Sequence, residues 1–359
     1  MQNLIGKNSI KNNTNKMLRA QKFKERIAWT CAPGGENHRD NQFIGVKPLI
    51  GSGLTANDMR LIGDYIMSKK EYNNINVELL DLNKLSGDKN VDDLRGYDKG
   101  MALVLRNWLS DDETTEIYRE SIEEVWDRKY LDPNKYRTEI VNGKEVRIRG
   151  KVLNKLAREN ICYVPGMEQD PDYLNGKGTI KDLNKKEKLC SVVSSLKKVI
   201  NTALSEGDSK TRVEINVVEG NRYYDLKKTG IGFHGDTERV VVICITIGGD
   251  GNFKLRWQWF KDGMPVGEHI DVNLKDGDVY IMSEKAVGPD WKKSSIYTLR
   301  HSAGSDKYTK TDRWEKKRPA YEERLRKRAE KLAAKEDKKR LKQTKLVFNN
   351  VRIKKVKKI

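Results

Sequence analysis

The pattern of short apolar segments between residues 213 and 301 constrains the fold more than any other feature. Hydrophobic side chains recur at every second position in 213–218 and 253–259, whereas 240–247 is apolar throughout. Alternation predicts half-buried strands, and a continuous apolar run predicts a strand buried on both faces. Because several such strands follow at short intervals, the segment predicts a jelly roll of two β-sheets.

The residues before this β-core favour helices. Helical spacing of apolar residues covers 55–70, with Thr55 as the predicted N-cap, and also 111–129 and 189–204. A strand is predicted over 101–105, and a hairpin over 137–151 turns at Asn142-Gly143. The predicted class is α+β: a double-stranded β-helix (jelly roll) with flanking N-terminal helices and a basic C-terminal tail. Four regions follow: an N-terminal extension of unassigned role (1–95), a helical and hairpin region (96–212), the β-core (213–313) and the tail (314–359). Trp257 and Trp259 share one strand face and are expected in the core.

Positive charge is concentrated at the C-terminal end. The 359 residues carry a net charge of +19, of which Trp314–Ile359 contributes +13, from 19 Lys or Arg against 6 Asp or Glu. Ion pairs at i,i+4 spacing predict a helix after Pro319, and the end beyond residue 350 is expected to be disordered until it meets a polyanion. The tail therefore predicts a nucleic-acid partner, DNA or RNA, bound through its phosphates.

Composition also bears on the compartment. No segment approaches the roughly 18 apolar residues that span a membrane, and residues 1–17 lack the apolar core of a secretory signal. The four cysteines are scattered without metal-type spacing. The expected location is a reducing, intracellular compartment, with no membrane association and no evident obligate protein partner.

Three side chains have the chemistry of a redox-metal site. His234 and Asp236 form a His-x-Asp pair, and His301 follows late in the last predicted strand. Two imidazoles and one carboxylate on one face of a metal leave three positions open, which suits Fe(II) oxygenases. Of the other histidines, His38 falls in a Gly/Asn-rich loop and His269 falls one strand too early. Alternatively, His301 is a core residue held by hydrogen bonds. No catalytic residue beyond the ligands is predicted.

The motifs around these residues resemble a known family. Asn221-Arg-Tyr223 precedes His234. The pattern His234-x-Asp236-x-Glu238 follows, and after it comes the strand that begins at Gly277-Asp278. Residues 221–313, and more weakly those back to 158, are similar to the AlkB-like 2-oxoglutarate and Fe(II)-dependent dioxygenases of large DNA viruses. The resemblance implies Fe(II), 2-oxoglutarate and O₂, with Asn221 and Tyr223 contacting 2-oxoglutarate. It also implies a location in the cytoplasm or nucleus of a host cell, or in a virion.

The sequence departs from this family at two places. Lysines follow Asp290-Trp291 where relatives have the second iron histidine, so the ligand is assigned to His301. Lys307 stands where the family has the first arginine of its carboxylate-binding segment. The 2-oxoglutarate clamp is therefore assigned to Arg313, with Lys307 second and Arg300 third, although each could be a surface cation.

The resemblance also assigns substrate contacts to Arg158, Tyr173 and Glu238. Arg158 would grip a phosphate and Tyr173 would stack on an extruded base; the alternative is a turn at 170–173 without a ligand. The implied activity is hydroxylation or demethylation of a nucleic-acid base. Two other functions stay open, a non-catalytic nucleic-acid-binding protein on the same scaffold and a protein side-chain hydroxylase.

Overall fold

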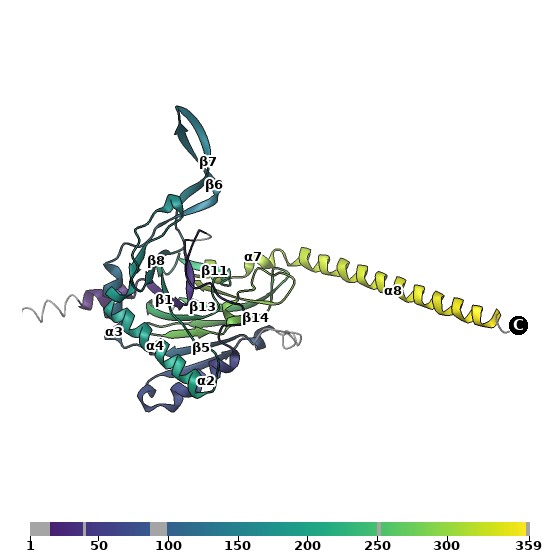
Figure 1. The fold of residues 1–359 in the computed structure, drawn as a ribbon, viewed down its shortest axis with the longest axis horizontal. Coiled ribbons are helices and arrows are strands. Elements are labelled where there is room, and N and C mark those ends of the chain that lie inside the picture. The colour runs from purple at the N-terminus through teal and green to yellow at the C-terminus, as the bar shows by residue number, and fades with distance from the viewer. Residues whose placement is uncertain (1–14, 39–40, 87–98, 250–252, 357–359) are drawn as a thin grey trace, which may run out of the picture. The chain divides into compact units, whose positions relative to one another are not determined.

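The computed structural model describes residues 15–38, 41–86, 99–249 and 253–356. The chain divides into two compact units, residues 1–309 and residues 310–359. The first unit contains two main β-sheets and the helices that cover them, and the second contains the long C-terminal helix (Figure 1). The α+β class predicted from the sequence is confirmed.

A sheet of eight strands forms the centre of the first unit. Its order is β4 (Asn76–Asp81), β5 (Met101–Arg106), β15 (Val279–Met282), β12 (Val242–Gly248), β1 (Arg26–Ala32), β10 (Val217–Tyr223), β8 (Glu159–Val164) and β9 (Ile180–Asp182). Neighbours are antiparallel except β8 and β9. Every residue of β12 is buried, which confirms the prediction for this apolar run.

A second sheet of four strands lies against the first. Its order is β11 (Gly230–His234), β16 (Thr298–Gly304), β13 (Lys254–Lys261) and β14 (Met264–Asn273). Trp257 and Trp259 of β13 have 0% exposure and pack with Val242 and Cys244 of the large sheet. Their prediction as core residues is confirmed, and truncating either to alanine would cost roughly 3–5 kcal/mol of stability.

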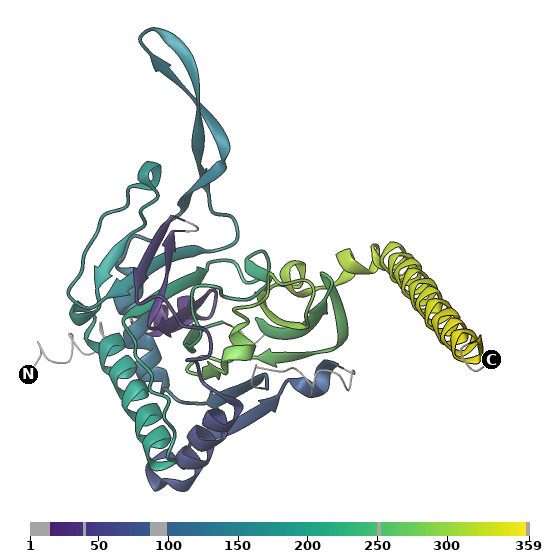
Figure 2. The same ribbon diagram turned by 45° about the vertical axis from the view of Figure 1, so that its right-hand side comes forward.

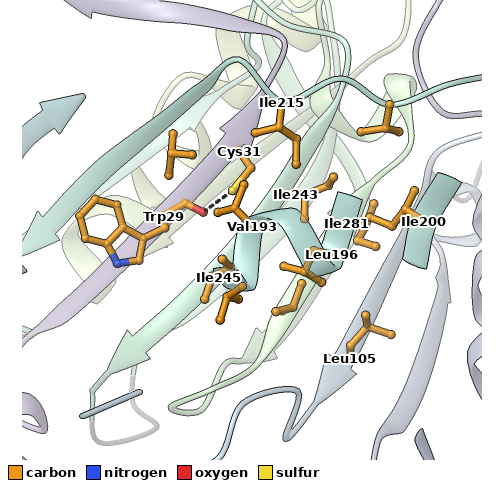
Figure 3. Packing of buried hydrophobic residues seen from close by; sticks show 14 of the residues in the cluster. Trp29, Cys31, Leu105, Val193, Leu196, Ile200, Ile215, Ile243, Ile245 and Ile281 are labelled. Atoms are coloured by element: carbon orange, nitrogen blue, oxygen red, sulfur yellow. Dashed lines mark hydrogen bonds between the residues drawn. The ribbon is translucent and has the colours of Figure 1, made fainter. Parts of the chain in front are cut away.

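Three helices cover the other face of the large sheet: α2 (Ala56–Ser68), α3 (Asp111–Ile122) and α4 (Glu187–Glu206). Leu196 of α4 packs in one cluster with Ile243 and Ile281 of the sheet (Figure 3). The predicted cap Thr55 forms a reciprocal capping box with Asp58 at the start of α2. The predicted helices are confirmed, with α3 shorter than expected because the chain beyond it turns to pair with the edge of β8.

The residues predicted as an N-terminal extension contribute to the core, and this is a correction. β1 lies inside the large sheet between β12 and β10. β2 (Gly34–His38) and β3 (Gln42–Gly45) follow it as a small separate sheet. Burial explains the difference: Trp29 and Cys31 are fully buried against the helices, so β1 is not an appendage. Residues 1–14, 39–40 and 87–98 of this region lie outside the described part of the chain.

A long two-stranded ribbon extends from this unit. β6 (Lys129–Val141) pairs with β7 (Lys144–Asn154). The turn falls at Asn142 and Gly143, whose φ values of 51° and 75° suit a tight hairpin turn, so the predicted hairpin is confirmed. Figure 2 shows the ribbon projecting away from both sheets.

The second unit consists of α7 (Asp312–Glu315) and α8 (Arg318–Val356). The helix predicted after Pro319 is present, but it continues to Val356, where the sequence favours a disordered end. Among the described residues, no helix is both long enough and apolar enough to cross a membrane.

Candidate metal centre

The three predicted ligands lie together between the two sheets. His234 ends β11 and pairs directly with His301 of the neighbouring β16. Their ring centroids are 4.3 Å apart, and the Nε2 atom of His234 lies 3.5 Å from Oδ1 of Asp236. One ligand atom from each residue falls within 4.8 Å of the other two. This spacing is short enough for all three to bind one ion.

The backbone after β11 holds Asp236 in this position. Its N–H donates to the carbonyl of Val287, the last residue of the short helix α5 (Glu284–Val287), at 3.0 Å. Gly235 makes the close approach possible, because a Cβ at this position would clash with the Gly288 carbonyl oxygen. The glycine in His-Gly-Asp is therefore required by packing.

The imidazoles of His234 and His301 are in the form that binds metals. Burial, reinforced by the nearby Arg158, lowers the pKa of His234 to about 4. Burial and the neighbouring His234 lower the pKa of His301 to about 3. The Nδ1 atom of His234 lies 2.8 Å from the Gly232 carbonyl, so Nδ1–H donates there and Nε2 keeps its lone pair toward Asp236.

A buried arginine offsets part of the negative charge of three carboxylates at the candidate centre. Arg239 is 4% exposed and pairs with Glu219 at 2.7 Å, with Glu238 at 3.6 Å and with Asp236 at 4.0 Å. Burial would raise the pKa of Glu219, but Arg239 and Arg158 hold it below its ordinary value. Burial and the Asp236 carboxylate raise the pKa of Glu238 to about 7.

A cavity of about 670 Å³ opens onto the three ligands. Four predicted site residues line it besides the ligands: Asn221, Tyr223, Arg158 and Glu238. The Oδ1 atom of Asn221 accepts hydrogen bonds from Nε of Arg158 and from Nδ2 of Asn160, at 2.7 Å for the latter. The amide of Asn221 and the arginine are thus already bonded to each other beside the ligands.

Tyr173 does not line the cavity. It lies in the turn Tyr173–Asn175, and its hydroxyl donates to the buried carboxylate of Asp127 at 2.8 Å. Thr179 donates to the same carboxylate from its backbone and from its hydroxyl. This structural turn corresponds to the alternative without a ligand.

None of the three cations predicted to clamp 2-oxoglutarate lines the cavity. Arg300 alternates with His301 on β16, so it points to the opposite face, and its guanidinium stacks on Phe260. Lys307 is exposed. Arg313 belongs to the second unit, where it stacks on Trp314.

One arginine on the inner face of the large sheet was missed by the sequence analysis. Arg26 is 1% exposed, and its Nη2 donates to the Leu274 carbonyl at 2.7 Å. It pairs across β1 and β10 with Tyr223 and is in phase with Ala28, which lines the cavity, but Arg26 itself is not among the lining residues. In the sequence, Arg26 is marked only by its place just before the apolar residues of β1. That place does not reveal which sheet β1 joins, so it could not predict that Arg26 lies beside Tyr223.

No family model matches the chain. A protein of Acanthamoeba polyphaga mimivirus, described as uncharacterized protein R156, is 34% identical over 295 residues, which cover 80% of this chain and 99% of that protein. The chain belongs to this viral protein's family. The similarity covers nearly all of the mimivirus protein. It supports the viral origin that the sequence motifs imply.

Proposed function

We propose that this protein is a 2-oxoglutarate and Fe(II)-dependent dioxygenase that modifies a nucleic-acid base. The observation that carries the proposal is the set His234, Asp236 and His301, held within 4.8 Å of one another at the wall of a 670 Å³ cavity. Such a donor set suits Fe(II) and leaves positions for a co-substrate and O₂.

The described residues fit such an ion. Both imidazoles are neutral at pH 7 because burial lowers their pKa values, so their lone pairs are available to a metal. Arg239 offsets part of the negative charge of the surrounding carboxylates. With 2-oxoglutarate and O₂, bound iron would supply the oxidising power that hydroxylates a C–H bond; on an N-methyl group the product would lose formaldehyde.

The arrangement of the sheets supports the finer fold assignment, a double-stranded β-helix. Four strands face part of the eight-stranded sheet; His234 and His301 come from two adjacent strands of the smaller sheet, β11 and β16, and Asp236 follows β11. Jelly rolls enclose ligand sites between two such sheets. In this assignment β1 is an internal strand of the larger sheet, paired with β10 on one side and with β12 on the other.

We assign the 2-oxoglutarate contacts to Asn221 and Tyr223, which line the cavity, and the clamp to Arg26, a buried arginine beside Tyr223 that does not itself line the cavity. Tyr223 lines the cavity, and Arg26 is its direct cross-strand partner, so the phenol and the guanidinium project from the same face. A guanidinium binds a carboxylate through two parallel hydrogen bonds. Arg158 and Glu238 then remain on the substrate side of the cavity.

The decisive experiment measures metal binding and turnover in the same preparation. Wild-type protein should bind Mn(II) and, with Fe(II) and O₂, should convert 2-oxoglutarate to succinate. The His234→Ala variant should neither bind Mn(II) nor form succinate. The His269→Ala variant is the matched control, because His269 is exposed on β14, away from the cavity.

Other results would favour the rival functions. Nucleic-acid binding without metal binding would favour a non-catalytic protein on the same scaffold. Metal-dependent succinate formation stimulated by a peptide, and not by methylated oligonucleotides, would favour a protein side-chain hydroxylase.

A further inference from the structure

The ribbon of β6 and β7 has a composition unlike that of a structural hairpin. Residues 129–154 contain seven Lys or Arg against three Asp or Glu, a net charge of +4. Within its outer half, Ile140 is 77% exposed and Tyr136 is 47% exposed. A strand pair that packs against the body of a protein buries one of its faces. Both faces of this ribbon are accessible, so packing against the body does not explain its length or its exposed side chains.

Basic and aromatic side chains share one face of the ribbon. Tyr136 pairs with Arg149 and Thr138 pairs with Arg147, which places these four on the same side. The guanidinium of Arg147 lies 4.2 Å from the Tyr136 ring centroid. Arg147 and Lys144 form no ion pair with any residue that the structure describes, so both charges are available to a partner.

The foot of the ribbon leads to the candidate metal centre. Tyr130 and Asn154, one from each strand, line the cavity that holds the three ligands. A second hollow of about 510 Å³ adjoins the foot and is lined by residues that include Arg128, Lys129 and Tyr224. Arg128, Lys129 and Lys155 therefore place positive charge at the foot of the ribbon, where Glu159 pairs with Arg128.

We infer that this ribbon is a nucleic-acid-binding arm, which grips the sugar–phosphate backbone and presents a base to the cavity at its foot. The inference rests on the proposed function for the identity of the reaction. A two-stranded ribbon fits the major groove of duplex DNA, and exposed arginine and lysine side chains bind phosphates. The exposed apolar tip, including Ile140, provides contacts with sugars and bases.

The test compares two charge-matched double variants of the full-length protein. One is Lys144→Ala/Arg147→Ala on the ribbon. The other is Lys198→Ala/Lys210→Ala, at exposed positions in and after α4, which covers the opposite face of the large sheet. Fluorescence anisotropy with labelled single-stranded and duplex oligonucleotides, over a range of salt concentrations, measures affinity and salt slope for each protein.

The ribbon variant should bind duplex on the order of tenfold more weakly at low salt, and its log–log salt slope should fall by about 1.8, or about 0.9 for each lost phosphate contact. The control variant should bind like wild type. Equal binding by the two variants would overturn the inference. So would a dimer that dissociates when Ile140→Ser is introduced, because the tip would then contact a second copy.

Failure of the arm and failure of the proposed function give different results. Succinate formation without nucleic acid should be the same in the ribbon variant and in wild type, because no ligand is altered. If wild type makes no succinate, the proposed reaction fails, and the binding comparison still decides the role of the ribbon. Tyr136→Ala, which changes no charge, should also weaken binding if bases or sugars contact the arm.

Discussion

At the scale of single residues, the candidate centre depends on groups that are not themselves candidate ligands. Gly235 allows the chain to pass against Gly288, and Arg239 sets the charge behind Asp236. The motif His234-x-Asp236 predicted two of the three clustered side chains, because these two residues are close in the chain. The supporting partners come from distant segments, so the motif alone could not predict them.

Gly235→Ala is expected to abolish Mn(II) binding, because the added Cβ would push the chain away from the Gly288 carbonyl and displace Asp236. Gly232→Ala is a matched control on the other side of His234, since a Cβ there meets no atom within 4 Å. Isothermal titration with Mn(II) measures both. Normal binding by Gly235→Ala would show that the loop can shift without moving the carboxylate.

The two buried histidines should make the metal-free protein sensitive to acid. Their folded-state pKa values, about 4 and about 3, lie below the ordinary 6.5, so only the unfolded chain takes up protons between these limits. The stabilisation is therefore complete above pH 6.5 and is lost as pH falls, by roughly 1.4 kcal/mol per pH unit for each imidazole. Glu238, with a raised pKa of about 7, acts in the opposite direction.

Comparing wild type with His301→Gln isolates one histidine from this background. Urea unfolding of the metal-free proteins at pH 7 and pH 5 should give a smaller loss of stability for the variant, by roughly 1.4 kcal/mol per pH unit. Equal losses would mean that His301 is protonated in the folded protein, which conflicts with a ligand role.

At the scale of elements, β1 joins the helix layer to the candidate centre. Its odd-numbered residues, among them Trp29, pack under the helices, while Ala28 and Thr30 face the cavity. One strand therefore serves two packing surfaces, as period-two alternation allows. Its place between β10 and β12 is a long-range pairing, which is why residues 1–95 had no assigned role in the sequence analysis.

Arg26→Met should weaken 2-oxoglutarate binding to the Mn(II)-loaded protein by about tenfold or more, because a charge-assisted hydrogen bond contributes roughly 1.5–3 kcal/mol. Methionine retains apolar bulk at this buried position. Arg300→Met is the control, since Arg300 points away from His301 and stacks on Phe260. Unchanged 2-oxoglutarate affinity in Arg26→Met, with normal Mn(II) binding, would refute the assignment of the clamp.

At the scale of the whole molecule, the two units separate the candidate chemistry from most of the charge. Every ligand lies within residues 1–309, and residues 314–359 carry a net charge of +13. Most side chains in the described part of α8 are exposed, and most of these are charged, so the helix has little apolar surface. A long helix of this kind is suited to contact with a polyanion.

Removing residues 314–359 should lower nucleic-acid affinity strongly at low salt and flatten the salt slope, because many phosphate contacts are lost. Mn(II) binding and nucleic-acid-independent succinate formation should persist. Anisotropy titrations and the succinate assay measure the two effects. Unchanged nucleic-acid binding with a lower melting temperature would mean that the tail stabilises the body and does not bind the nucleic acid.

The sequence by itself determined the elements whose signals are local. Alternating and continuous apolar runs identified the strands, Thr55 identified a helix start, Asn142-Gly143 identified a turn, and the histidine pattern identified His234 and His301. Each depends on residues that are close in the chain or on the chemistry of one side chain.

Only the tertiary structure decided which distant segments share a sheet or a cavity. It brought Arg26 beside Tyr223, turned Arg300 away from the ligands, and paired Tyr173 with Asp127. These outcomes depend on strand order and on which face each side chain takes. Strand order is set by the burial of apolar surface over the whole unit, and no local pattern records it.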